Sequence, residues 1–149
     1  MKLKQVKTSL EELGWREIMA APIGGGDPVP IEGGRYCQFP MDDEDESAPM
    51  ISISDFPAGW ERAPHAHGTD YVMIVLEGSV QVSGKWLYKG DVRIVSAGAG
   101  YGPLISGPDG VKELVIFREG NKRAPIRKGK ARFDDAPGVS VRAVALPPL

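Results

Sequence analysis

The chain has 149 residues and a mass of 16.0 kDa, the size of one ordinary domain and too small for two separate cores. Its 18 basic side chains nearly balance its 20 acidic ones, so nothing in its net charge of -2 favours binding to nucleic acid or to an anionic membrane surface. Its 19 glycines and 13 prolines disfavour long helices and suit short strands joined by tight turns, so we expect one all-β domain.

The cysteine content and the hydropathy of the chain bear on its location. The single cysteine, Cys37, cannot form a disulfide within the chain, which fits a reducing compartment. No apolar run approaches the roughly 18 residues that a membrane-spanning helix needs. The first residues also lack the apolar stretch of a signal peptide. We therefore expect a cytoplasmic protein without a membrane partner.

The N-terminal third predicts one short helix and little other regular structure. Ser9 and Glu12 have the spacing of a capping box, and Gly14 follows as a stop signal. Glycines and prolines then interrupt the chain repeatedly, which leaves room for short edge strands such as 35–39. The consecutive acidic residues of 42–46 repel one another, and this favours a solvated loop over a cation site.

The middle of the chain has the pattern of an antiparallel sheet. Segments with alternating or continuous apolar residues predict strands at 50–54, 72–76, 79–83, 92–95 and 112–117. Turn signals separate several of them, at Glu77-Gly78, at Ser83-Gly84 and at 88–91. Such signals recur about every 8 to 12 residues, a spacing typical of β-sandwiches and β-barrels.

The C-terminal part changes character along its length. It begins with basic residues, which we expect on a solvated surface. Near its end, residues 139–144 alternate between apolar and polar, which predicts an added strand available for pairing with a partner subunit.

The two histidines of the protein are His65 and His67, separated by a single alanine. On an extended segment, residues i and i+2 point to the same face, so both imidazoles converge on one side of the sheet. Metal ligation and acid-base catalysis both need such an arrangement. If the following strand keeps the register, Tyr71 and Met73 share this face. The alternative is a pair of exposed loop histidines beside Pro64.

The spacing around these histidines resembles the first motif of the cupin superfamily, G-x5-H-x-H-x3,4-E-x6-G, through Gly59, His65, His67 and Gly78. The second motif, G-x5-P-x-G-x2-H-x3-N, is matched by Gly90 and Gly98. The resemblance covers residues 50–118, with 1–49 as an N-terminal extension and 119–149 as a C-terminal tail. It implies that 1–149 is a single cupin domain, an antiparallel double-stranded β-helix (jelly roll). The family's barrels hold a small-molecule ligand in their mouth and are frequently homodimers.

The departures from the family pattern concern the metal ligands. Tyr71 replaces the glutamate of the first motif, and Tyr101 replaces the histidine of the second. Ser96 and Ile105 replace the proline and the asparagine of the second motif. Asp70 lies one position too early and, by strand parity, should face away from the pocket. Two of the four usual metal ligands are therefore phenols, and a phenol with a pKa near 10 is a costly anionic ligand at neutral pH.

These residues support three interpretations of function. In the first, His65, His67, Tyr71 and Tyr101 are catalytic groups of a metal-independent lyase or isomerase, which transfers protons in isomerisation, dehydration or another elimination. In the second, His65 and His67 bind a divalent or ferric ion, completed by Tyr71 and Tyr101, in a cupin oxygenase. In the third, the protein is a ligand-binding or sensor domain without turnover.

Other side chains near the motifs are candidates for substrate binding. Arginines at or near strand ends can hold a substrate carboxylate or phosphate, and those in the motif region are Arg62, Arg93 and Arg118. Trp60, together with Trp86 and Phe117, can form an aromatic wall for a planar substrate. The alternatives are arginines that face solvent and aromatic residues that only pack.

Overall fold

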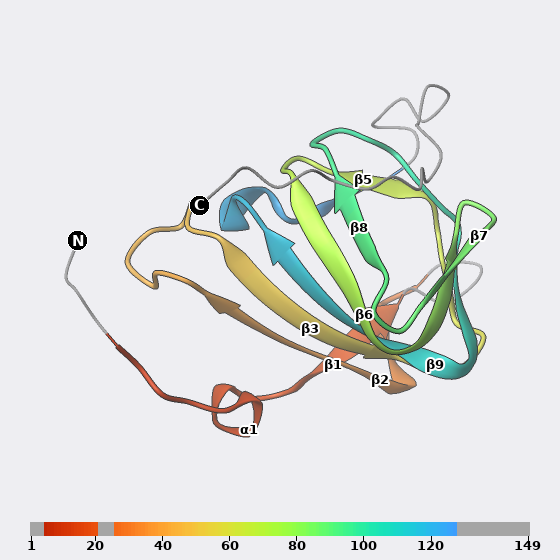
Figure 1. The fold of residues 1–149 in the computed structure, drawn as a ribbon. Helices are drawn as coiled ribbons and strands as arrows, with labels where there is room; N and C mark the ends of the chain where they lie inside the picture. The colour runs from red at the N-terminus through yellow and green to blue at the C-terminus, as the bar shows by residue number, and fades with distance from the viewer. Residues whose placement is uncertain (1–4, 21–25, 128–149) are drawn as a thin grey trace.

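Long antiparallel strands make up most of the molecule, shown as a ribbon in Figure 1. The computed structural model describes residues 5–20 and 26–127. In chain order its elements are α1 (Leu10–Leu13), β1 (Arg16–Ala20), β2 (Val29–Pro40), β3 (Met50–Phe56), β4 (Glu61–Arg62), β5 (His65–His67), β6 (Tyr71–Val82), β7 (Lys85–Tyr88), β8 (Val92–Val95), β9 (Leu104–Phe117), the 3-10 helix η1 (Gly120–Lys122) and β10 (Pro125–Arg127).

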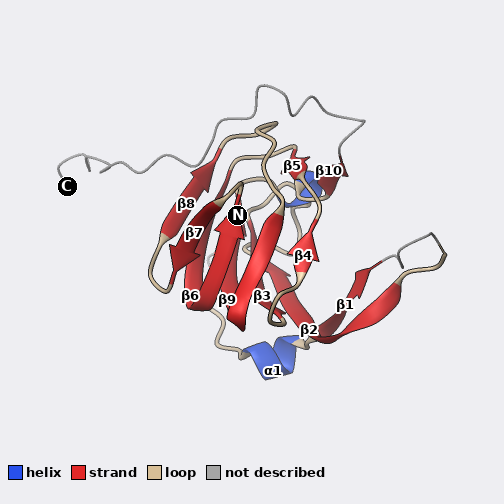
Figure 2. Cartoon of the chain, turned by 90° about the vertical axis from the view of Figure 1, so that its right-hand side faces the viewer, coloured by secondary structure: helices blue, strands red, loops and turns tan. Residues whose placement is uncertain are grey.

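The strands form two antiparallel sheets. The larger has eight strands in the order β1-β2-β3-β9-β6-β7, with β4 paired to β9 and β8 paired to β6. The smaller contains only β5 and β10. Figure 2 shows β6 to β9 curving into a barrel wall, from which the β1–β2 pair projects. This arrangement confirms the predicted all-β antiparallel jelly roll with one short N-terminal helix.

Helix α1 begins and ends where the sequence predicts. The Ser9 hydroxyl oxygen accepts a hydrogen bond from the Glu12 backbone N–H at 3.2 Å. Gly14 ends the helix with φ 93°, and its N–H donates to the Leu10 carbonyl at 2.9 Å. Both contacts satisfy backbone groups that a helix of one turn otherwise leaves unpaired.

Strand β6 corrects the prediction of two strands separated by a turn at Glu77-Gly78. It is one continuous strand, whose register on β9 shifts on both sides of Gly78. Gly78 has φ 72°, and a Cβ there would lie 2.0 Å from the Gly110 carbonyl oxygen. The glycine thus forms a β-bulge that bends the strand without ending it. The true hairpin turn is the next one, with φ 50° at Ser83 and φ 81° at Gly84.

Strands β2 and β9 are also longer than the sequence predicts at 35–39 and 112–117. Strand β2 runs through Gly33 and Gly34, which the sequence interpretation took as breaks, and β9 runs through Gly107 and Gly110. Gly110 of β9 has φ 75°, and a Cβ there would lie 2.6 Å from the Phe56 carbonyl oxygen. Glycine therefore marks bends and close backbone contacts within these strands, not their ends.

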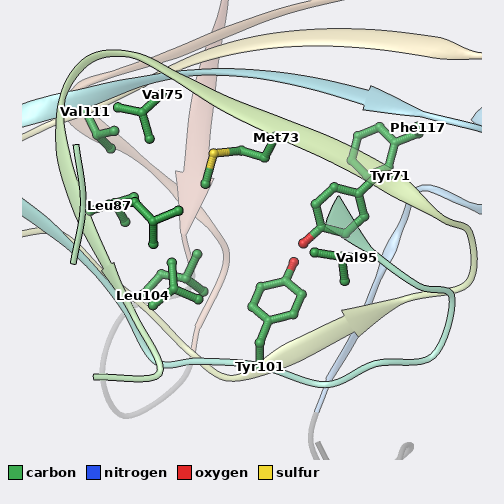
Figure 3. Packing of buried hydrophobic residues seen from close by; sticks show 11 residues of the cluster. Tyr71, Met73, Val75, Leu87, Val95, Tyr101, Leu104, Val111 and Phe117 are labelled. Atoms are coloured by element: carbon green, nitrogen blue, oxygen red, sulfur yellow. The ribbon is translucent and has the colours of Figure 1, made fainter. Parts of the chain in front are cut away.

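The core fills the barrel with side chains from the inner faces of β6 and its neighbours (Figure 3). Along β6, Tyr71, Met73 and Val75 are buried while the residues between them are less so. This alternation confirms that Tyr71 and Met73 share one face. Burial of each such side chain contributes about 1.5–3 kcal/mol. The rest of the buried cluster is Val80, Val82, Leu87, Val95, Tyr101, Leu104, Val111 and Phe117.

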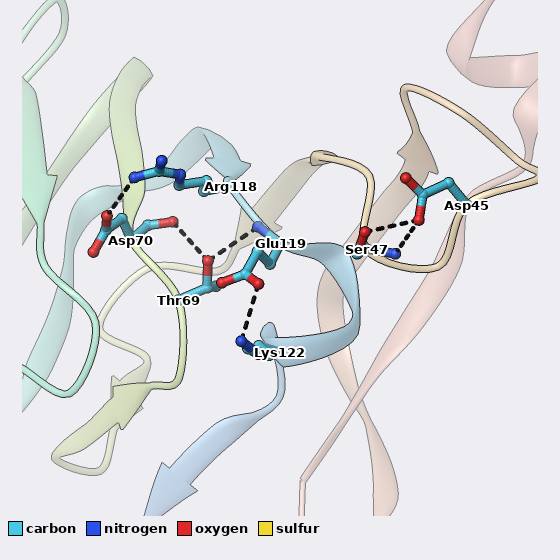
Figure 4. A network of polar contacts seen from close by, with 7 residues as sticks. All are labelled: Asp45, Ser47, Thr69, Asp70, Arg118, Glu119 and Lys122. Atoms are coloured by element: carbon cyan, nitrogen blue, oxygen red, sulfur yellow. Dashed lines mark hydrogen bonds and ion pairs between the residues drawn. The ribbon is translucent and has the colours of Figure 1, made fainter. Parts of the chain in front are cut away.

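Local hydrogen bonds stabilise the acidic surface loop. In the acidic loop 42–46, the Asp45 carboxylate accepts hydrogen bonds from the backbone N–H and the hydroxyl of Ser47 (Figure 4). Residues 43–46 are exposed, as the sequence predicts.

The strand predicted at 139–144 lies outside the described residues. Within the described ranges, no helix has the length and hydropathy to cross a bilayer.

Candidate functional site

Four aromatic rings that the sequence singled out lie together inside one end of the barrel. They are His65 and His67 of β5, Tyr71 at the start of β6, and Tyr101 in the segment before β9, and we call them the ring cluster. Ring centroids are 4.8 Å apart for His65 and Tyr101, and 5.2 Å apart for His67 and Tyr71. The two imidazoles are 5.1 Å apart. The imidazoles are half-buried and the phenols are buried, so the cluster opens toward solvent on its histidine side.

Backbone pairing places Tyr101 beside His65. Each residue donates its N–H to the carbonyl of the other at 3.0 Å, an isolated antiparallel bridge. The same segment is held to β5 by a bond from the Gly98 N–H to the His67 carbonyl at 2.8 Å. Gly102 has φ 120°, and a Cβ there would lie 2.8 Å from the Pro64 Cα. The glycines around Tyr101 thus allow the close approach that brings the phenol to the imidazole.

The Ala63 carbonyl determines which nitrogen of His65 donates and which accepts a hydrogen bond. Its Nδ1 lies 2.8 Å from the Ala63 carbonyl oxygen, which can only accept, so Nδ1 carries the proton. In the neutral ring Nε2 then has the lone pair. Nε2 lies 3.0 Å from the Tyr101 hydroxyl, which therefore donates to it. His65 Nε2 is therefore a base, and the Tyr101 hydroxyl is the proton donor bonded to it.

His67 is held in the same tautomer by a different segment. Its Nδ1 donates to the Arg123 carbonyl oxygen at 2.6 Å, next to the pairing of β5 with β10. Burial lowers the pKa of His67 from its usual value, the bond to the Arg123 carbonyl opposes this shift, and the positive charge of Arg93 lowers the pKa further. The ring is therefore neutral at pH 7.

Arg93 of β8 lies behind the phenols. Its side chain points inward, and the residue is only 6% exposed. One guanidinium nitrogen, Nη2, donates to the Tyr71 hydroxyl at 2.5 Å, and the guanidinium carbon lies 4.0 Å from the centroid of the Tyr101 ring. The two phenol oxygens point toward each other (Figure 3). Burial is the main cause that raises the pKa of both phenols, so each keeps its proton at neutral pH.

A buried ion pair that the sequence interpretation missed lies in the same barrel. Glu113 of β9 accepts two hydrogen bonds from Arg62, at 2.6 and 3.2 Å. The Arg62 guanidinium also lies 3.9 Å from the centroid of the Phe56 ring. The sequence signal was available, because alternation along 112–117 puts Glu113 on the same face as Phe117. A carboxylate at an inward position of an apolar strand needs a buried partner.

The remaining candidates divide between the cluster and the surface. Phe117 packs against His67, with ring centroids 5.1 Å apart. Arg118, another candidate, lies on the surface, where its side chain is 75% exposed and pairs with Asp70 at 3.2 Å (Figure 4). Asp70 faces away from the cluster, as strand parity predicts. In the described part of the chain, the Trp60 ring contacts no other aromatic ring, and its backbone carbonyl accepts from the Ser106 N–H.

A hollow of about 270 Å³ lies at a different place. It is lined by carboxylates of the acidic loop together with Asn121 and Arg123, and by no residue of the ring cluster. The ring cluster itself is closely packed, so a ligand that reaches Nε2 of His65 has to displace the Tyr101 hydroxyl.

Comparison with known proteins identifies the architecture. The sequence matches no protein-family model and no curated protein. The polyketide cyclase RemF from Streptomyces resistomycificus is 11% identical with a TM-score of 0.63, over 84% of this chain and 86% of that one. A putative acetylacetone dioxygenase from Methylibium petroleiphilum PM1 is 18% identical with a TM-score of 0.56, over 78% of each chain. The protein has the cupin fold.

A mutant of the oxalate decarboxylase OxdC from Bacillus subtilis has the same fold, with a TM-score of 0.62 and 15% identity. The match covers 86% of this chain but 33% of the decarboxylase, so this cupin-fold chain spans about a third of that enzyme's length. At these identities the likeness concerns the fold, and the chemistry has to be argued from the ring cluster.

The donor set of the ring cluster does not fit a divalent ion. Among the described residues, no three His, Cys, Asp or Glu side chains lie close enough to hold a metal together. The two phenols keep their protons, because burial raises the pKa of each. The guanidinium of Arg93, bonded to Tyr71 and stacked on Tyr101, adds a fixed positive charge that repels a cation.

Proposed function

We propose that this cupin-fold protein binds a small carbonyl compound at the ring cluster and transfers a proton within it, as a metal-independent lyase or isomerase. The observation that carries the proposal is the hydrogen bond from the Tyr101 hydroxyl to Nε2 of His65, made beside a second protonated phenol. The reaction class is isomerisation, dehydration or another elimination.

His65 acts as the general base. A ligand that displaces the Tyr101 hydroxyl meets the Nε2 lone pair, which removes a proton from the carbon next to the ligand's carbonyl. The imidazolium that forms is stabilised by the bond from Nδ1 to the Ala63 carbonyl. A positioned general base contributes about 10² to 10⁴ in rate.

The phenols act as proton donors to the oxygen that gains charge. As the C–H bond breaks, its electron pair forms the C=C bond of an enolate, and the carbonyl oxygen becomes negative. Tyr71 and Tyr101 donate hydrogen bonds to this oxygen, and Arg93 behind them stabilises the charge. The imidazolium then returns its proton to another carbon in an isomerisation, or to a departing hydroxyl group in a dehydration.

The proposal is tested by proton exchange in deuterated water. We expect the protein to catalyse loss of the α-proton NMR signal of pyruvate, acetoacetate or acetylacetone above the rate in buffer. His65→Gln should lower this rate about 10²-fold or more, while Arg118→Gln, a change on the surface, should not. A His65→Gln variant as fast as the unchanged protein contradicts the role of His65.

The close packing of the cluster supports a second candidate, a ligand-binding domain without turnover. Tyr71 is 6% exposed and Tyr101 is 8% exposed, so both phenols are well placed to hold a ligand but are screened from water. A metabolite that copurifies and is released unchanged would favour this function. The cupin oxygenase, the homodimer and the cytoplasmic location stay predictions, which metal analysis with chelation, light scattering and cell fractionation would test.

A further inference from the structure

We propose that Arg93 makes the floor of the ring cluster a binding site for one negative charge, and that the ligand is a small organic carboxylate. This inference rests on the proposed function in placing the ligand at the ring cluster, and it adds the class of that ligand.

The first observation is that Arg93 is a buried cation that forms no ion pair with a carboxylate of the described residues. In the described part of the chain, ion pairs join carboxylates to Arg35, Arg62, Arg118 and two lysines, but not to Arg93. Its partners are a neutral phenol hydroxyl and the face of a neutral ring. A buried charge is costly unless an opposite charge compensates it, so the site gains most from an anionic ligand.

The second observation is the contrast with Arg62 in the same barrel. Glu113 neutralises Arg62 with two hydrogen bonds and is itself only 5% exposed at its side chain. The described interior thus holds one neutral ion pair and, next to the ring cluster, the unpaired charge of Arg93. His67, the titratable neighbour with a pKa lowered by burial and by Arg93, adds no compensating negative charge.

The third observation is that strand β8 points its arginine inward at the expense of apolar burial. Its residues alternate so that Arg93 and Val95 are buried, while Val92 is 55% exposed and Ile94 is 68% exposed. Pairing of Arg93 with Met73 on β6 fixes this register. A shift by one residue would bury Val92 and Ile94 and expose Arg93 and Val95, so two apolar side chains would be buried in place of one, and hydrophobic burial alone does not explain the observed orientation.

The chemistry of guanidinium favours a carboxylate over other small ligands. Arginine has five N–H donors in a planar fork that matches the two oxygens of a carboxylate. The hydrogen bond to Tyr71 uses only part of this capacity, so further N–H groups of Arg93 are left for a carboxylate while the two phenols donate to the carbonyl oxygen of the same ligand.

The test compares carboxylates with neutral compounds of the same shape. Acetate and benzoate, and their amides acetamide and benzamide, are titrated into the protein, and binding is followed by NMR and by the increase in Tm. We expect each carboxylate to bind at least about tenfold more tightly than its amide, since hydrogen bonds to charged groups are the stronger ones. Equal affinity of acid and amide, or no binding of either carboxylate in the millimolar range, overturns the proposal.

Variants locate the binding. Arg93→Met should remove the preference for the carboxylates, Arg93→Lys should keep part of it, and Arg118→Gln should leave it unchanged. An unchanged preference in Arg93→Met overturns the proposal. If Arg93→Met does not fold, the comparison of acid and amide on the unchanged protein still decides. His65→Gln should stop proton exchange but keep carboxylate binding, so failure of the proposed function and failure of this inference give different results.

Discussion

The buried pair of Arg62 and Glu113 offers the sharpest test of how the barrel interior is built. Glu113→Gln keeps the shape of the side chain but removes its charge, which leaves Arg62 without its anion. The side chain of Glu113 is 5% exposed and that of Arg62 is 18% exposed, so water compensates for little of the loss. Nε of Arg62 already lacks a hydrogen-bond partner within the described structure.

Loss of one partner of a buried ion pair costs about 3–5 kcal/mol. The partial exposure of Arg62 places our expectation at the lower end, about 3 kcal/mol. For a protein of this size, each kcal/mol shifts Tm by about 2–4 °C, so Tm should fall by about 6–12 °C. Arg118→Gln removes the exposed pair with Asp70 and should leave Tm nearly unchanged, because solvent screens such a pair.

The assay is chemical denaturation followed by circular dichroism, with the single variants Glu113→Gln and Arg62→Met and the double variant. The double variant should be more stable than the sum of the single losses predicts, because it leaves no uncompensated charge. A Glu113→Gln variant that loses less than about 1 kcal/mol would show that the pair behaves as a solvated surface pair, and would refute this description of the interior.

Three further predictions concern the bulge, the pH dependence and the metal. Gly78→Ala should destabilise the protein by more than Gly84→Ala in denaturation assays. Both glycines have positive φ, but only at Gly78 would a Cβ meet backbone, 2.0 Å from the Gly110 carbonyl oxygen. Equal losses of stability in the two variants would contradict the bulge geometry. The pKa of His67 lies below its unfolded value of about 6.5, so the unfolded state binds the proton first, and stability should fall as pH drops below about 6.5 and level off below the folded pKa. His67→Gln should flatten Tm in that range, and an equally steep profile in the variant would assign the effect elsewhere. Removal of divalent ions with EDTA should leave Tm and proton exchange unchanged, whereas a loss that Zn²⁺ or Fe²⁺ restores would favour the oxygenase.

Much of the fold could be predicted because strand alternation and capping are local. The parity that puts Tyr71 and Met73 on one face, the helix cap at Ser9 and the strand 92–95 all follow from neighbouring residues in the chain. Gly78 was misinterpreted because a positive φ serves a turn and a bulge equally well. Only the close approach of β9, far away in the sequence, shows which of the two is present.

The sequence predicted which residues form the ring cluster but not the hydrogen bonds that orient them. The motif spacing brought the two histidines and two tyrosines to attention, and the structure places them together. The acceptors that fix the imidazoles are backbone carbonyls of Ala63 and Arg123, which no side-chain pattern reveals. Likewise, Arg62, Arg93 and Arg118 look alike in sequence. Only the structure shows that Arg62 pairs with Glu113, that Arg118 pairs with Asp70 on the surface, and that Arg93 pairs with no carboxylate of the described residues.

The state of the two imidazoles decides whether the ring cluster can move a proton. Histidine labelled with ¹⁵N reports it directly, because the chain has only 2 histidines and His67→Gln assigns them. At neutral pH we expect His65 to be neutral with its proton on Nδ1, and Tyr101→Phe to change the Nε2 signal of His65 alone. A His65 ring protonated on Nε2, or already an imidazolium, would contradict the proposed base, because no lone pair would then face the ligand.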